Sequence, residues 1–375
     1  MLVVGVVSAG IVSAPTPLPA RPDRDRSAAA TTSASAPAAS LARTCGAEPT
    51  DAAGWQRMWD SQTGTWSGGD GASSTRLPDG RLLWLFGDTY LGGVDTSGRR
   101  VAGTRLVRNS IAVTDGTCVD LLPTADDALP GRVGTWLWPT HAVVTRTSGT
   151  PARLVVFAQR ITRTGAGSWG FRRTGTAVVS LTVPARGAPV VGAVRDLPSS
   201  DVLWGAATLT EGATTWIYGT RGSSSPLVFG RDLLLAQAPT ATAGDERTWT
   251  YRTSHGWSSG ASSAAVVRPA REGVSTVPSV TRVGRSYVVV TKPDEFLGDD
   301  VVALTAPHPW GPWVEHALFR ASSTPTELRY SPCLVTAHSG RTAVVVVSRT
   351  STSFDLLARD AWRAHPTFTD VRLPG

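Results

Sequence analysis

Short apolar runs, separated by turn residues, recur along the chain. Five of them share one form, in which branched and aromatic residues follow a turn: 81–88 (RLLWLFGD), 153–160 (RLVVFAQR), 214–221 (TTWIYGTR), 286–293 (SYVVVTKP) and 342–349 (TAVVVVSR). Turn signals such as Asp79-Gly80 precede these runs, and further strand-like runs accompany them. Runs of this length and composition are typical of β-strands. The pattern therefore predicts five units of four antiparallel strands.

Repeated four-stranded units are typical of propeller blades, whereas a β-sandwich would not show five of them. The first residues of the five runs lie 72, 61, 72 and 56 positions apart, and blades of that size account for nearly every residue after Cys45. We therefore predict an all-β protein, with a five-bladed β-propeller of four-stranded antiparallel blades over residues 45–375.

The hairpin predicted over residues 66–91 has the clearest pattern. Asp79-Gly80 is a strong turn signal, and the apolar run 82–86 fits a buried strand. Because the two arms are antiparallel, Asp70 near the start and Asp88 at the end lie at one edge of the sheet. Two carboxylates at one edge can perform acid–base chemistry, although both also fit a role as turn caps beside glycine.

The blade topology predicts which other residues meet the two carboxylates. In a four-stranded blade the innermost strand starts, and the second strand ends, on the same side of the disc. The residues expected at this central funnel are Asp70, Asp88, Trp138, His141, Gln159, Arg160, Trp204, Arg221, Lys292, Asp294, Glu295, Tyr330, Ser331 and Arg349. Glu211 falls in a turn on the opposite side, so we expect a structural role for it.

The composition excludes several functions. The net charge is +7, but the arginines are scattered and form no nucleic-acid module, so we expect no nucleic-acid partner. The positive balance could favour anionic polymers such as cell-wall glycans. Since the chain has neither a phosphate-binding glycine loop followed by a helix nor metal-ligand spacing, we predict no cofactor and no metal.

The first 44 residues predict export. Residues 1–20 contain a short apolar segment of the kind found in signal peptides, with a short apolar tail as the alternative, and residues 21–44 form an Ala/Ser/Pro-rich linker that we expect to be disordered. The charged stretch that normally opens a signal peptide is missing, which predicts a start further upstream. No apolar stretch reaches 18 residues, so we expect a secreted protein without a stable membrane anchor.

An exported chain meets an oxidising compartment, in which cysteines pair. Cys45 opens the folded part and Cys118 lies at a polar strand end, so we predict a disulfide between them. Cys333, in an apolar context, is predicted to be a buried free thiol.

Several motifs resemble an uncharacterised family of secreted bacterial five-bladed propellers, related in architecture to glycoside hydrolases of the arabinanase, invertase and levansucrase type. The most specific are GGDG and LFGDT, supported by the other motifs at 106–110, 136–139, 204–206, 216–220 and 310–313. The resemblance covers roughly residues 55–374. Two positions depart from it: Thr140-His141 follows the Trp-Pro where relatives often have an acid, and Tyr330-Ser331 precedes a proline where they often have a histidine.

The resemblance and the predicted funnel together indicate a glycoside hydrolase acting on a polysaccharide or cell-wall glycan, as a monomer. Asp70 would be the base or nucleophile, Asp294 or Glu295 the acid, and Asp88 would orient the site. The predicted substrate-binding residues are Trp138, His141, Trp204, Arg221, Lys292, Tyr330 and Arg349. The alternative is a propeller without catalysis, which binds glycans or interacts at the cell surface. Carboxylates about 5–10 Å apart across one cavity would favour the hydrolase, with either stereochemical outcome.

Overall fold

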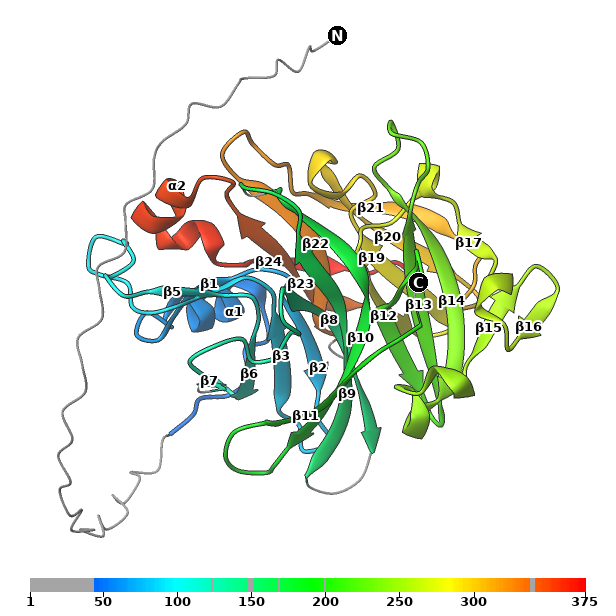
Figure 1. The fold of residues 1–375 in the computed structure, drawn as a ribbon, viewed down its shortest axis with the longest axis horizontal. Helices are drawn as coiled ribbons and strands as arrows, with labels where there is room; N and C mark the ends of the chain where they lie inside the picture. The colour runs from blue at the N-terminus through cyan, green and yellow to red at the C-terminus, as the bar shows by residue number, and fades with distance from the viewer. Residues whose placement is uncertain (1–43, 123, 147–150, 168, 199, 338–340) are drawn as a thin grey trace, which may run out of the picture. The chain divides into compact units, whose positions relative to one another are not determined.

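Strands make up most of the described chain, which in this computed structural model comprises residues 44–375 without 123, 147–150, 168, 199 and 338–340 (Figure 1). The predicted leader, and the linker up to residue 43, therefore lie outside the described residues. Cys45–Gly375 is one compact unit. The all-β prediction is confirmed, because the described residues hold 24 strands and two α-helices, α1 (Ala52–Asp60) and α2 (Phe354–Arg359).

The described residues form six sheets with antiparallel strand pairs, and five of these sheets follow one another along the chain (Figure 1). The first has the order β2 (Ser73–Arg76), β3 (Leu82–Phe86), β6 (Ser110–Asp115), β7 (Cys118–Leu121). The second contains β8 (Thr135–Arg146), β9 (Ala152–Arg163), β10 (Phe171–Val183), β11 (Val190–Asp196). The third contains β12 (Leu203–Glu211), β13 (Thr214–Gly222), β14 (Arg231–Pro239), β15 (Thr250–Thr253), β16 (Gly256–Ser258), and β17 (Val266–Arg268) pairs with β14. The fourth contains β18 (Ser279–Val283), β19 (Ser286–Thr291), β20 (Asp300–Ala306), β21 (Val314–Arg320), and the fifth β22 (Leu328–Ala337), β23 (Thr342–Thr350), β24 (Thr367–Arg372).

The predicted number of four strands per unit holds for the first, second and fourth sheets only. The third sheet is larger, because the long connection after β14 folds into the extra hairpin β15–β16 and returns as β17. The fifth sheet has three strands within the described residues. The strand order does not by itself define a ring, so the five-bladed propeller stays a prediction.

The hairpin over residues 66–91 forms, but as two ladders instead of one. β2 pairs with β3 across the Asp79-Gly80 turn, where Gly80 has a φ of 92°. The arms continue as β1 (Trp66–Gly69) and β4 (Thr89–Leu91), which join β5 (Arg105–Val107) in a small separate sheet. Between the ladders the Asp70 amide donates to the Asp88 carbonyl at 3.1 Å. The two acids therefore face each other at the break, as their positions in the hairpin predicted.

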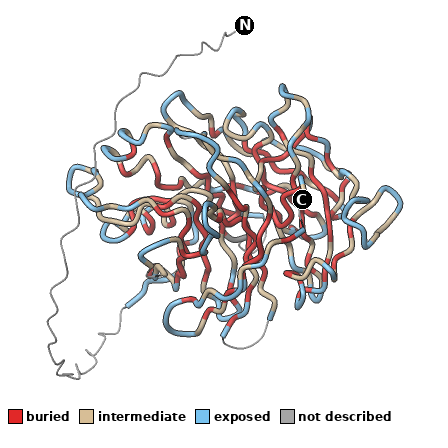
Figure 2. The backbone as a smooth tube through the Cα atoms, viewed as in Figure 1, coloured by how far each residue is buried: buried red, intermediate tan, exposed pale blue. Residues whose placement is uncertain are grey.

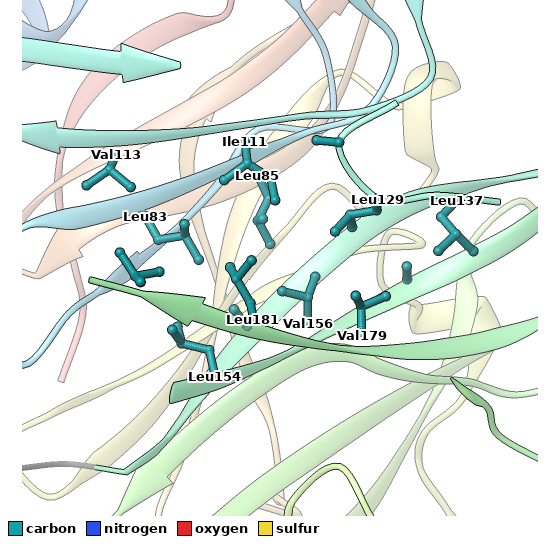
Figure 3. Close-up of a cluster of buried hydrophobic side chains, with 14 of the residues drawn as sticks. Leu83, Leu85, Ile111, Val113, Leu129, Leu137, Leu154, Val156, Val179 and Leu181 are labelled. Carbon is teal, nitrogen blue, oxygen red and sulfur yellow. The ribbon is translucent and has the colours of Figure 1, made fainter. Parts of the chain in front are cut away.

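The core consists of five clusters of buried side chains, each of which joins two sheets. Figure 3 shows the cluster between the first and second sheets, in which Leu83 and Leu85 meet Val156 and Val179. Corresponding clusters join the second sheet to the third, the third to the fourth and the fourth to the fifth. The last joins the fifth sheet to the first and also contains buried side chains of α1. Exposed residues gather in the connections between strands (Figure 2).

Six short 3-10 helices occupy connections among the described residues: η1 (Thr240–Thr242), η2 (Glu246–Thr248), η3 (Ala261–Ser263), η4 (Ala270–Glu272), η5 (Glu295–Leu297) and η6 (Ala361–Ala364). Near the start of the unit, Cys45 and Cys118 form the predicted disulfide, with Cα atoms 5.3 Å apart. Cys333 is free and buried, also as predicted. No helix in the described ranges is long and apolar enough to cross a membrane.

Candidate active site

A cavity of about 590 Å³ lies where Asp70 and Asp88 face each other. Residues near all five sheets line it, and aromatic and charged side chains are frequent among them. The lining includes Asp70, Asp88, Tyr90, Arg108, Trp136, Trp138, Gln159, Arg163, Trp169, Phe171, Arg173, Arg231, Glu295, Phe296 and Tyr330. Of the residues that the sequence pattern placed at the funnel, the cavity brings together Asp70, Asp88, Trp138, Gln159, Glu295, Tyr330 and Ser331.

Asp70 is held between the two ladders of the hairpin. The Tyr330 hydroxyl donates to Asp70 Oδ2 at 2.5 Å, and the Gly87 amide donates to the Asp70 carbonyl at 2.7 Å. A Cβ on residue 87 would lie 2.5 Å from Asp70 Oδ1, so glycine is required for this close approach. Burial, together with the charge of Asp88, raises the pKa of Asp70 to about 7. Its carboxyl can therefore carry a proton near neutral pH.

Asp88 has a different environment. Trp138 Nε1 donates to its Oδ1 at 2.8 Å, and Arg108 Nη1 donates to its Oδ2 at 3.0 Å. Burial raises the pKa of Asp88, while the charge of Arg108 and the two hydrogen bonds oppose that rise. Both donors bind the anion, so this carboxyl is equipped to act as a carboxylate.

Asn109 fixes the residues around Asp88, and sequence reasoning missed it. Its side chain is fully buried, and its Nδ2 donates to the Leu129 carbonyl at 3.0 Å and to the Leu137 carbonyl at 2.9 Å. The Leu129 amide donates in turn to Asn109 Oδ1 at 2.5 Å. Asn109 directly follows Arg108 in the sequence, and Leu137 directly precedes Trp138. The hydrogen bond between Asn109 and Leu137 therefore connects the segments that carry the two donors to Asp88. Two signals were available in the sequence: Asn109 is the only asparagine in the chain, and it lies in the motif at 106–110.

Glu295 reaches the cavity from η5. Its Oε1 accepts hydrogen bonds from the amide and hydroxyl of Thr276 and from Arg231 Nε at 3.1 Å. Its neighbour Asp294, also predicted as the acid, is exposed and does not line the cavity. The tight turn explains the difference, because Glu295 has a φ of 56° and the Asp294 carbonyl accepts from Leu297 and Gly298.

Aromatic rings form much of the cavity wall. Trp138 packs edge-on against Phe171, with ring centroids 4.7 Å apart, and lies 5.9 Å from Trp136. Trp169 contacts Phe296 at 5.2 Å, which links the β9–β10 connection to η5. Trp169 is 56% exposed, so part of its ring remains open to a ligand. Such rings can stack on the apolar faces of sugars.

The remaining predicted binding residues do not line the cavity. His141 is buried; its Nε2 lies 3.1 Å from the Pro278 carbonyl and donates to it, and burial lowers its pKa to about 4, so the ring is neutral. Trp204 is 2% exposed and packs on Tyr251 in the core. His141 lies within a strand irregularity, because β8 and β9 shift register between Pro139 and Ala142, whereas Trp204 comes just before the shift of β12 and β13 between Trp204 and Ala207. A bulge of this kind changes the side to which the following residues point.

Three predicted cations have structural partners instead. Arg221 pairs with Asp232 at 2.9 Å. Lys292 is fully buried, donates to the carbonyls of Ala321 and Arg329 at 2.7 Å each, and has its pKa lowered by burial to about 8. Arg349 donates to the carbonyl of His365 at 3.2 Å and to that of Trp362. The sequence pattern predicted where the second strands end. It did not predict the direction of these three side chains.

Arg108, Trp136, Trp169, Phe171, Arg173 and Arg231 line the cavity without having been predicted. Most lie on outer strands or connections, whose side chains the repeat pattern does not place. Among the described residues no group of three or more His, Cys, Asp or Glu side chains could hold a metal ion.

The described residues thus form a strand-rich fold with two facing carboxyls in one cavity. The chain belongs to a family described as a domain of unknown function (DUF5005), which matches residues 55–363. A candidate hydrolase from Bacteroides ovatus shares the fold, with a TM-score of 0.69 at 19% identity over 85% of this chain and 89% of that one.

Two further solved structures are more distant. One is a GH43_1 enzyme from Xanthomonas citri, with a TM-score of 0.45 at 12% identity over 85% of this chain and 93% of that one. The other is an alpha-L-arabinofuranosidase from Lactobacillus brevis, with a TM-score of 0.46 at 11% identity over 82% and 91%. Among curated proteins, none matches the chain in sequence.

Proposed function

We propose that this protein is a glycoside hydrolase that acts on a polysaccharide through Asp70 and Asp88. The observation that carries the proposal is the contrast between these two carboxyls in one aromatic cavity. Asp70 has a pKa raised to about 7, whereas Asp88 receives hydrogen bonds from Arg108 and Trp138. A pair of carboxyls in contrasting environments is the usual basis for dividing acid and base roles between them.

In this proposal Asp70 is the general acid and Asp88 the base or nucleophile. Asp70 protonates the glycosidic oxygen as the bond to the anomeric carbon breaks, and Asp88 either activates water or attacks that carbon. This exchanges the roles expected from the sequence, in which Asp70 was the base. Glu295 is unsuited to be the acid, because its Oε1 already accepts from Thr276 and Arg231.

We also propose the five-bladed propeller as the scaffold. Its support is the order of the core clusters, which link each sheet to the next and the fifth sheet to the first. Strand β3 illustrates this order: Leu83 and Leu85 join the cluster with the second sheet, while Trp84 and Phe86 join the cluster with the fifth. A strand buried on both faces between two other sheets is expected of a blade in a closed ring.

We further propose that the protein is exported and acts as a monomer. The Cys45–Cys118 disulfide fits an extracellular protein, since such bonds persist in oxidising compartments. The short apolar segment within residues 1–20 of the sequence also fits export.

The test is a screen of the purified chain on arabinan, galactan and cell-wall polysaccharides, with release of reducing sugar as the measurement. We expect Asp70→Asn and Asp88→Asn each to lower turnover on a cleaved substrate by about 100-fold or more, because general acid–base catalysis supplies at least that factor. Asp79→Asn, on the same hairpin but outside the cavity, is the matched control and should keep full turnover. Turnover that survives Asp70→Asn would refute the assignment, and glycan binding without any cleavage would favour the non-catalytic alternative.

A further inference from the structure

Four arginines and three acids line the cavity. Two arginines are paired with acids: Arg108 with Asp88 at 3.0 Å, and Arg231 with Glu295 at 3.1 Å. The two other lining arginines, Arg163 and Arg173, form no ion pair with any carboxylate of the described residues. The third lining acid, Asp70, is bonded to Tyr330 and not to an arginine. Arg163, which is exposed, and Arg173, which is half-buried, donate to backbone carbonyls, so neither charge is compensated by an ion pair among the described residues.

The β9–β10 hairpin directs both arginines to the same side. Arg163 lies opposite Phe171, and Arg173 lies opposite Ile161. These four residues all line the cavity, as expected from the alternation of side chains along paired strands. Arg172, between two lining residues, is exposed and does not line it.

Arg173 is held in place without being neutralised. Its Nη1 lies 3.4 Å from the carbonyls of both Ser200 and Val202, and its Nη2 donates to the carbonyl of Asp201. Backbone carbonyls orient a guanidinium but do not cancel its charge. Burial and the charge of Arg231 lower the pKa of Arg173, while the charge of Asp201 opposes that shift. An arginine that lines a cavity without an ion-pair partner can offer its charge and its paired donors to an anionic ligand.

We infer that the glycan bound in this cavity carries an anionic group, which Arg163 and Arg173 bind. The chemistry fits a uronate carboxylate or a sulfate or phosphate ester, because a guanidinium offers paired donors to planar or tetrahedral anions. This inference rests on the proposed function only in taking the ligand to be a glycan at this site; it does not depend on cleavage.

The test measures binding with the Asp70→Asn protein, so that any ligand stays intact. The probes are matched pairs: oligogalacturonate and its methyl ester, hyaluronan oligosaccharides and their carboxyl-reduced form, and dextran sulfate and dextran. We expect at least one acidic probe to bind about tenfold or more tighter than its neutral partner, as the loss of one charge-assisted hydrogen bond would imply. The preferred pair identifies a carboxylate or a sulfate as the recognised group.

Adding Arg173→Gln or Arg163→Gln should remove that preference, while Arg172→Gln on the same hairpin should keep it. Two variants are used because Arg173 also orders backbone around residues 200–202, and thermal unfolding of each variant checks its fold. Equal affinity for the acidic and neutral member of every pair would overturn the inference. So would a preference that persists in both cavity variants. Either result leaves the hydrolase proposal to be decided by the turnover of wild type and Asp70→Asn.

Discussion

At the scale of single residues, the site depends on two aspartates. Their backbones are hydrogen-bonded to each other, but their carboxyls have different partners. The Asp70 amide and the Asp88 carbonyl are hydrogen-bonded, yet one carboxyl faces a phenol and the other a guanidinium and an indole. Because a phenol donates one neutral hydrogen bond, it stabilises a carboxylate less than the charged Arg108 does. Burial raises the pKa of both carboxyls, and the side chains that approach from outside the hairpin determine how strongly that rise is opposed at each of them.

The pH dependence of the unfolding free energy should reveal the raised pKa of Asp70. A carboxyl whose pKa is higher in the folded state binds more protons there, so wild-type unfolding free energy should fall as pH rises from about 4 to about 7. Each unit of pKa difference corresponds to about 1.4 kcal/mol. Asp70→Asn removes this titration, so its stability relative to wild type should increase by a few kcal/mol over that range.

Urea unfolding at several pH values measures the effect. Asp79→Asn is the control, because the pKa of Asp79 is lowered in the folded state, so its contribution changes mainly below about pH 4 and its loss should leave the slope between pH 4 and 7 nearly unchanged. Parallel curves for wild type and Asp70→Asn between pH 4 and 7 would show that Asp70 ionises normally.

At the scale of elements, the hairpin over residues 66–91 was predictable because its signals are local. An Asp-Gly turn and an apolar run determine the pairing, and antiparallel geometry then brings Asp70 to Asp88. The second sheet was less predictable. Its bulge between Pro139 and Ala142 leaves Trp138 in the cavity but turns His141 into the interior, and no local pattern marks such a shift. Strand position could be predicted, therefore, but side-chain direction near a bulge could not.

Asn109 connects these elements, and its removal should affect both stability and function. Asn109→Ala leaves the Leu129 amide and two buried carbonyls without their partner, which should lower the unfolding free energy by about 2–4 kcal/mol. Because Arg108 and Trp138 would lose their fixed positions, glycan turnover should also fall in protein that is still folded.

Urea unfolding and turnover at a temperature well below the midpoint separate the two effects. Thr145→Ala, which removes one exposed hydrogen bond at the far end of β8, is the comparison and should change both little. Full turnover in folded Asn109→Ala would mean that the amide serves stability alone.

At the scale of the whole molecule, the all-β character could be predicted because the apolar strand runs recur along the chain. The unequal sheets could not: the extra hairpin β15–β16 and the separate sheet of β1, β4 and β5 arise in connections with short, mixed patterns. The cavity lining shows the same limit. The acids come from a clear repeat, whereas Arg173 and Phe296 come from an outer strand and a 3-10 turn. Repeats thus predict a scaffold better than the connections that complete its site.

The start of the compact unit is tied to the first sheet by the disulfide, and this makes a prediction about the whole fold. Cys45 and Cys118 are 73 residues apart in sequence, so the bond restricts a long loop of the unfolded chain. The chain-entropy model gives about 4 kcal/mol for a loop of this length. Cys45→Ser with Cys118→Ser should therefore lower the unfolding free energy by up to that amount.

Thiol labelling counts the cysteines independently of stability. Cys333 is 3% exposed, and burial raises the pKa of its thiol, so it should not react in the native protein. We expect no label on native unreduced protein, one label after unfolding and three after unfolding with reductant. Cys333→Ala provides the control, since it should lose the single label without reductant and keep two labels with it. One label on native unreduced protein would contradict the buried thiol, and two or more would contradict the disulfide.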